Sequence, residues 1–169
     1  MSPAPVVAAP AEAPAAKPWK VPESVLVVIH TPDLQVLLMN RADAPGHWQS
    51  VTGSKDWPGE PLHDTAVREV AEETGIDALA PGCELRDWQL ENVYDIYPDW
   101  RWRYAPGVTR NRERVFGLRV PGVLPVRLAP REQHGQPLVA LARGGGALLS
   151  PSNAEALLLL PRFTQGAGA

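Results

Sequence analysis

Short apolar runs separated by turn residues dominate the first third of the chain. Residues 21–30 form a Val- and Ile-rich run, which predicts a strand buried on both faces. Residues 31–33 predict a turn, and residues 34–41 predict a second strand that forms a hairpin with the first. A short strand is expected over residues 48–52, and it ends directly before Gly53.

The later part of the chain predicts further strands and one more helix. Residues 85–97 and 114–120 read as strands, and residues 99–104 (DWRWRY) alternate charged and aromatic side chains as a strand does. Residues 152–160 predict a helix, with Ser152 as its N-cap and Glu155 in the capping-box position. Strands mixed with two helices indicate an α/β protein.

The helix between these two groups of strands carries an unusual charge pattern. It is expected over about residues 64–74, with His63 or Asp64 near its start and Gly75 at its end. At about 100° per residue, its three central glutamates fall on one side and its smaller or apolar residues on the other. The acidic set is Glu69, Glu72 and Glu73, and the opposite set is Val67, Val70, Ala71 and Thr74.

Three carboxylates so close together repel one another, and a bound cation would remove that repulsion. Carboxylate oxygens suit the hard ions Mg²⁺ and Mn²⁺. A solvated acidic helix face is the alternative for the helix taken by itself. The turn that leads into the helix favours the metal site, because VTGS and PGE bring backbone groups toward the carboxylates.

Residues 53–76 resemble the Nudix box, G-x(5)-E-x(7)-R-E-U-x-E-E-x-G-U, in which U is a bulky aliphatic residue. Eight positions are in register: Glu60, Arg68, Glu69, Val70, Glu72, Glu73, Gly75 and Ile76. Gly53 departs from the pattern, because six residues rather than five separate it from Glu60. One extra loop residue costs little free energy.

The resemblance implies a Nudix-type α/β/α sandwich with a mixed β-sheet, and a metal-dependent hydrolase acting on a nucleoside diphosphate linked to another group. It implies that Glu69 and Glu73 bind Mg²⁺ or Mn²⁺, that Glu72 is a further ligand or the base, and that the Gly53 carbonyl also reaches the ion. We expect Arg68 to pair with Glu72 four residues on, and Glu60 to steady the loop.

Two further segments, WQSVTGS (residues 48–54) and RYAPGVTRN (residues 103–111), resemble the dihydroneopterin triphosphate pyrophosphatase branch of the family. A plain hairpin loop is the alternative for the second segment alone. This branch releases pyrophosphate from 7,8-dihydroneopterin 3′-triphosphate in folate biosynthesis. The resemblance implies these substrate-binding residues: Lys20, Arg41, Thr52, Tyr94, Asp95, Ile96, Tyr97 and Ser150.

Glu132 is expected to complete the metal site, as a glutamate of this region does in the family. The residues after it (133–149) do not resemble the family segment, and the match resumes at Ser150. We interpret the odd stretch as a pair of compensating frameshifts, which DNA sequencing and peptide masses would test.

Composition narrows the class of protein. The 169 residues predict one domain, and a net charge of −3 gives no support to a nucleic-acid surface. A single cysteine fits a reducing compartment. Residues 1–19 are rich in Ala and Pro and predict a disordered tail before a domain at 20–165. No apolar run suits a signal peptide or a membrane span, so we expect a cytoplasmic protein.

The expected activity is therefore Mg²⁺-dependent hydrolysis of dihydroneopterin triphosphate, a small-molecule substrate. Two alternatives stay open. One is a broad nucleoside triphosphate pyrophosphatase that cleans the nucleotide pool with the same metal chemistry. The other is a Nudix-like module that binds a nucleotide without catalysis, although such modules usually lack the box glutamates.

Overall fold

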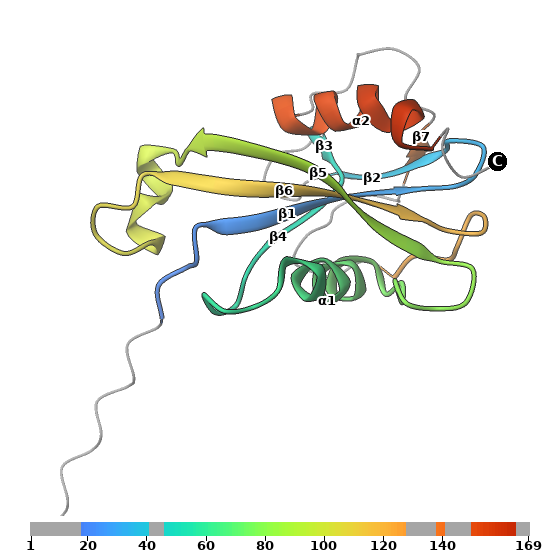
Figure 1. Ribbon diagram of the computed structural model, residues 1–169. Helices are drawn as coiled ribbons and strands as arrows, with labels where there is room; N and C mark the ends of the chain where they lie inside the picture. The colour runs from blue at the N-terminus through green and yellow to red at the C-terminus, as the bar shows by residue number, and fades with distance from the viewer. Residues whose placement is uncertain (1–17, 41–45, 128–137, 141–149, 165–169) are drawn as a thin grey trace, which may run out of the picture.

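The computed structural model describes residues 18–40, 46–127, 138–140 and 150–164. These residues form a mixed sheet with α1 (Leu62–Thr74) against one face and α2 (Pro151–Thr164) against the other (Figure 1). The expected α/β/α sandwich is thereby confirmed. No helix within the described ranges is long and apolar enough to cross a membrane.

Strand β1 (Glu23–His30) is the centre of the sheet. It runs parallel to β6 (Arg110–Arg119), which in turn pairs antiparallel with β5 (Glu84–Asp95). Along β1, Val25, Val27 and Ile29 pack on the α1 side, and Leu26 and Val28 pack on the α2 side. The prediction that this strand is buried on both faces is confirmed, because alternate side chains of a strand enter two different cores.

The other edge of β1 is shared by two strands. The end of β1 pairs with β2 (Val36–Asn40) in the expected hairpin, and its first half pairs antiparallel with β4 (Val51–Ser54). Strands β3 (Trp48–Gln49) and β7 (Leu138–Ala140) pair with β2. The single strand expected at residues 48–52 is thus two strands that pair with different partners.

Helix α1 begins two residues earlier than expected, after Pro61, and no side chain caps it. It ends as predicted: Gly75 adopts a left-handed conformation (φ 71°), and its N–H donates to the Ala71 carbonyl. The expected division into two faces is wrong at two positions. Ala71 is exposed, whereas Glu73 is buried between the helix and the rest of the fold.

Helix α2 is longer than the predicted 152–160, and its cap is not Ser152. The Ser150 hydroxyl accepts the backbone N–H of Asn153 at 3.4 Å, so Pro151 takes the first helical position, where its missing N–H costs nothing. Asn153 then ties the helix to the sheet, because its Oδ1 accepts the N–H of buried Ser50 at 2.8 Å.

The strand predicted at residues 99–104 is instead a 3₁₀ helix, η1 (Pro98–Arg103). Pro98 favours a helical first turn. The alternation of charged and aromatic residues in DWRWRY therefore led to the wrong prediction of a strand. Figure 1 shows η1 beyond the end of β5, where it lies beside the starts of β1 and β6. This end of the sheet carries the candidate site.

Candidate functional site

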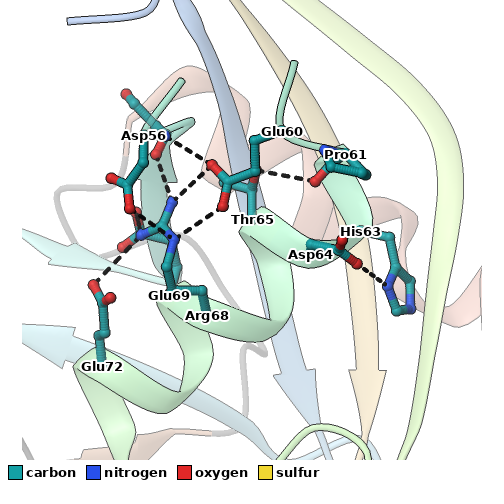
Figure 2. A network of polar contacts seen from close by, with 10 residues as sticks. Asp56, Glu60, Pro61, His63, Asp64, Thr65, Arg68, Glu69 and Glu72 are labelled. Atoms are coloured by element: carbon teal, nitrogen blue, oxygen red, sulfur yellow. Dashed lines mark hydrogen bonds and ion pairs between the residues drawn. The ribbon is translucent and has the colours of Figure 1, made fainter. Parts of the chain in front are cut away.

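Arg68 makes polar contacts with both the loop and the helix that follow β4 (Figure 2). Its Nη2 donates to the Ser54 carbonyl at 2.9 Å, its Nη1 donates to Glu69 Oε1 at 2.9 Å, and its Nε donates to Glu60 Oε1 at 3.1 Å. The contact with Glu72, which the sequence predicted, is present at 3.5 Å and is the longest of these. One guanidinium therefore joins the end of a strand, a loop and the helix.

Glu60 fastens the loop from the other side. Its carboxylate is 3% exposed and accepts the backbone N–H of Asp56 at 2.7 Å in addition to two N–H groups of Arg68. A buried carboxylate is stable when cationic and backbone donors satisfy its oxygens. The loop between β4 and α1 is thus held in a single course.

These contacts set the pKa values of the site. Burial alone would raise the pKa of Glu60, but the hydrogen bonds and charge of Arg68 outweigh it and the pKa is lowered. Burial raises the pKa of Glu69 to about 7, because Arg68 compensates only part of the cost and the charges of Glu72 and Asp56 add to it. The two glutamates raise the pKa of Arg68 despite its burial.

Gly53 of β4 lies directly against the Glu69 side chain of α1. A Cβ placed on it would lie 1.8 Å from the carboxyl carbon of Glu69, so any side chain there would displace that carboxylate. The glycine at this position therefore leaves room for the Glu69 carboxylate, and the extra residue in the following loop leaves this contact intact.

The types of donor suit a hard divalent cation, because the helix offers carboxylate oxygens and the neighbouring strand offers the Gly53 carbonyl. Glu69, Glu72 and Glu73 share one helix, and Gly53 lies against the first of these. Among the described residues, no group of three or more His, Cys, Asp or Glu side chains is arranged to hold an ion. Glu132, the further expected ligand, lies outside the described residues.

A cavity of about 570 Å³ opens beside Gly53. That volume is typical of a small-molecule site. Its wall includes residues from four parts of the chain: the start of β1, strand β4, the β5–η1 segment and the start of β6. The lining residues are Lys20, Ser24, Thr52, Gly53, Ser54, Tyr94, Asp95, Ile96, Tyr97, Asp99, Trp100, Trp102, Arg103, Tyr104 and Asn111.

A buried polar network supports one wall of this cavity. Asn111 Nδ2 donates to Ser24 Oγ at 2.7 Å and to the Tyr94 hydroxyl at 3.0 Å. Behind them Glu113 accepts a hydrogen bond from Asn92 Nδ2 at 3.5 Å, and the Ser152 and Tyr94 hydroxyls also stabilise its charged form. Burial raises the pKa of Glu113, and these neutral donors only partly offset it. Burial also raises the pKa of Tyr94, to which the nearby charge of Glu113 contributes.

Comparison with known proteins places this arrangement in a family. The NUDIX domain family matches residues 20–137. The chain belongs to the NUDIX family. The dihydroneopterin triphosphate diphosphatase of Escherichia coli K12 is 47% identical to it over 106 residues, which is 62% of this chain and 70% of the relative. The enzyme of the same name from Haemophilus influenzae is 39% identical over 99 residues, 58% of this chain and 62% of the relative.

A solved structure agrees with these sequence matches. The structure of the E. coli dihydroneopterin triphosphate pyrophosphohydrolase superposes with a TM-score of 0.69 at 38% identity, covering 89% of this chain and all of that one. Family membership makes this chain a Nudix hydrolase, of a class that acts on phosphoric anhydrides and generally needs divalent metal ions.

The structure brings most of the predicted substrate residues together. Lys20, Thr52 and the Tyr94–Tyr97 segment line the cavity, and Gly53 links it to the Nudix helix. Ser150 serves as the cap of α2. Arg41 and the stretch 133–149 fall outside the described residues, except for Leu138–Ala140 in β7.

Sequence reasoning missed several residues of the cavity. Asn111 is the last residue of the segment RYAPGVTRN and was not singled out as a site residue. Ser24 lies within an apolar strand, where no polar contact was expected. Trp100 and Trp102 were assigned to a strand, which hid the fact that both face one cavity from η1. Glu113 carried a signal, since a strand begun at residue 110 places it on the same face as Asn111.

Proposed function

We propose that this Nudix hydrolase converts 7,8-dihydroneopterin 3′-triphosphate to the monophosphate and pyrophosphate, as the names of its E. coli and H. influenzae relatives suggest. One observation carries the proposal: Gly53 lies both in the wall of the cavity and against Glu69. A substrate whose ring occupies the cavity therefore extends its triphosphate chain toward the carboxylates of α1.

We assign metal binding to Glu69, Glu73 and the Gly53 carbonyl, with Mg²⁺ as the preferred ion, Mn²⁺ as a substitute and Glu132 as a further ligand. When bound, the ion neutralises charge on the phosphates and activates the attacking water. We assign Glu72, whose side chain is 59% exposed, as a further metal ligand or as the base that accepts a proton from that water. Arg68 keeps Glu69 and the loop in position.

The cavity wall supplies complementary groups for the rest of the substrate. Lys20 and Arg103 provide positive charge for phosphate oxygens, and Tyr94 and Tyr97 provide aromatic surface for the pterin ring. Arg41 is assigned to the phosphates as well. We further propose a small-molecule substrate, a role in folate synthesis, a cytoplasmic location and no nucleic-acid or membrane partner.

The direct test is pyrophosphate release with Mg²⁺, comparing dihydroneopterin triphosphate with the common nucleoside triphosphates. We expect kcat/KM to be highest for the pterin substrate. Comparable rates on all substrates would refute the assignment and favour a pool-cleaning pyrophosphatase. No release from any of them, by a folded and Mg²⁺-binding protein, would favour a binding module. Glu73→Gln should abolish turnover while the fold persists; full turnover by this variant would refute the metal assignment.

A second experiment tests the role of Gly53 without removing a carboxylate. Gly53→Ala should displace the flexible end of Glu69 and lower turnover by about 100-fold, because a shift of about 1 Å in a site can cost that much. Gly59→Ala is the matched control, since its Cβ would meet Trp57 at an ordinary 3.6 Å. Equal activity of the two variants would show that Gly53 is only a turn residue.

A further inference from the structure

Helix η1 carries two tryptophans that are exposed although they are large and apolar. Trp100 is 44% exposed and Trp102 is 73% exposed, and both lie in the wall of the cavity. Trp88 offers a contrast within the same chain: it is 6% exposed and stacks on Phe163 of α2 at a centroid distance of 4.7 Å. Trp88 fills a core, whereas the two tryptophans of η1 present aromatic surface to the cavity.

The segment that carries these side chains is firmly held. The Trp100 N–H donates to the Tyr97 carbonyl at 2.9 Å, and Arg101 Nε donates to the Ile96 carbonyl at 3.0 Å. The backbone N–H of Lys20 donates to the Arg103 carbonyl at 2.9 Å, which joins η1 to the segment that enters β1. Backbone hydrogen bonds thus fix the positions of the two tryptophans and Lys20 relative to one another.

The aromatic rings also support one another. Tyr97 and Trp100 meet edge to face at a centroid distance of 5.5 Å, and the Arg103 guanidinium lies 5.7 Å from the ring centroid of Trp102. A guanidinium near an indole face and an edge-to-face pair both favour a fixed ring orientation. Fixed aromatic surface in a cavity is what stacking of a planar heterocycle requires, because stacking needs little further ordering of the protein.

We propose that Trp100 and Trp102 extend the aromatic surface of Tyr94 and Tyr97 into a stacking platform for the heterocyclic ring of the substrate and favour a bicyclic ring over a single ring. The inference rests on the proposed function in one respect, the use of this cavity as the substrate site. Charged lining residues favour a small ligand over a protein partner: Lys20 and Arg103 provide cations, and Asp95 and Asp99 provide carboxylates within the same cavity. A polar phosphorylated heterocycle matches this mixture.

The test uses reaction products, which bind without turnover. Dissociation constants are measured by calorimetry for dihydroneopterin monophosphate and GMP, which have two fused rings, for UMP, which has one, and for pyrophosphate, which has none. In Trp102→Ala we expect binding of the two bicyclic ligands to weaken about 10- to 100-fold, as loss of a base–aromatic stack does. UMP should lose less, and pyrophosphate should bind as before.

Three variants complete the design. Trp100→Ala should behave as Trp102→Ala does, and Trp102→Phe should restore most of the affinity because it keeps an aromatic face. Leu79→Ala is the control, since Leu79 is 65% exposed and does not line the cavity. Trp102 is highly exposed, so its replacement should leave thermal unfolding unchanged even if Trp100→Ala disturbs the fold.

Several results would overturn the inference. These are unchanged binding of the bicyclic ligands in Trp102→Ala, an equal loss for pyrophosphate, or no preference of the unaltered protein for bicyclic ligands over UMP. Sedimentation that shows self-association abolished by Trp102→Ala would assign the surface to a second copy of the chain instead. The binding comparisons do not depend on turnover, so a failure of the proposed function is detected by a different experiment. It would appear as hydrolysis that prefers a nucleoside triphosphate over dihydroneopterin triphosphate.

Discussion

Two glutamates on opposite faces of the sheet are buried to nearly the same extent, and their pKa values shift in opposite directions. Glu60, on the α1 side, is 3% exposed and has a lowered pKa. Glu113, on the α2 side, is 4% exposed and has a raised pKa. Burial raises the pKa of both carboxylates, and the groups that surround them differ.

The surroundings differ in charge. Glu60 accepts two N–H groups of the Arg68 guanidinium, whereas the groups that stabilise the charge of Glu113 are Asn92, Tyr94 and Ser152, all of which are neutral. A cationic donor adds Coulomb attraction for the ionised carboxylate, which neutral donors lack. Within this Nudix fold, the α1 side therefore holds a charged glutamate that fixes a loop, and the α2 side holds a glutamate that is more readily protonated.

Removing Arg68 should have the largest effect, because it would leave Glu60 buried without its cation. Arg68→Met should lower the free energy of unfolding by about 3–5 kcal/mol, the usual cost of breaking a buried ion pair, and should abolish activity. Urea unfolding at pH 7 measures it. Arg114→Met is the matched control: Arg114 binds Asp87 through two nitrogens on the outer surface, so its loss should cost at most about 1 kcal/mol. Equal costs would show that the α1 network is no stronger than a surface pair.

Replacing Glu60 tests the same network by changing the carboxylate instead of the guanidinium. Glu60→Gln keeps the shape but loses the charge, and should cost about 2 kcal/mol at pH 7, since hydrogen bonds to charged groups contribute about that much. A lowered pKa means that the contribution of Glu60 is present above its ordinary value of 4.5 and is lost as the pH falls through the lowered value. The difference between Glu60→Gln and the unaltered protein should therefore shrink in acid. A constant difference from pH 7 to pH 2 would contradict the assigned pairing.

Glu113 should show the opposite dependence on pH. Its raised pKa means that stability is complete below 4.5 and is lost as the pH rises through the raised value, because the folded state resists ionisation. Glu113→Gln removes that loss, so its stability relative to the unaltered protein should increase from pH 5 to pH 9. At pH 5 we expect a cost of about 1 kcal/mol, that of one neutral hydrogen bond. Thermal unfolding of both proteins across this range measures the trend, and a decreasing trend would mean that a cation stabilises Glu113.

This comparison shows what the sequence could and could not predict. The spacing of Glu69, Glu72 and Glu73 predicted a shared helix, and Gly75 predicted its end, because both depend on residues close in the chain. The contacts of Arg68 with Glu60 and with the Ser54 carbonyl depend on the course of an irregular loop, and no local pattern predicts that. The expected Glu72 pair was the only contact that helix periodicity could supply.

The α2 side was harder to predict for a different reason. The sequence RNRERV reads as a polar stretch, so the predicted strand began at Arg114 and excluded Asn111 and Glu113. Their neutral partners come from β1, β5 and α2, segments that are distant in the chain, and the pairing of β6 with both β1 and β5 brings most of them together. In η1, alternation of charged and aromatic residues imitated a strand. Polar residues on a buried face and short 3₁₀ segments are therefore the features that periodicity misses.

The smallest expected effect isolates one neutral donor to Glu113. Tyr94→Phe removes the hydroxyl that stabilises the charged form of Glu113 and accepts Asn111 Nδ2, which keeps its bond to Ser24. We expect a loss of about 1 kcal/mol in the free energy of unfolding, larger at pH 9 than at pH 5, because an ionised carboxylate gains more from the donor than a protonated one. Tyr97→Phe is the control, since its ring is 70% exposed and its replacement should cost less than about 0.5 kcal/mol. An equal loss of stability in Tyr94→Phe at both pH values would show that the hydroxyl supports Asn111 rather than the charge of Glu113. The two sides of the sheet would then differ in packing rather than in electrostatics.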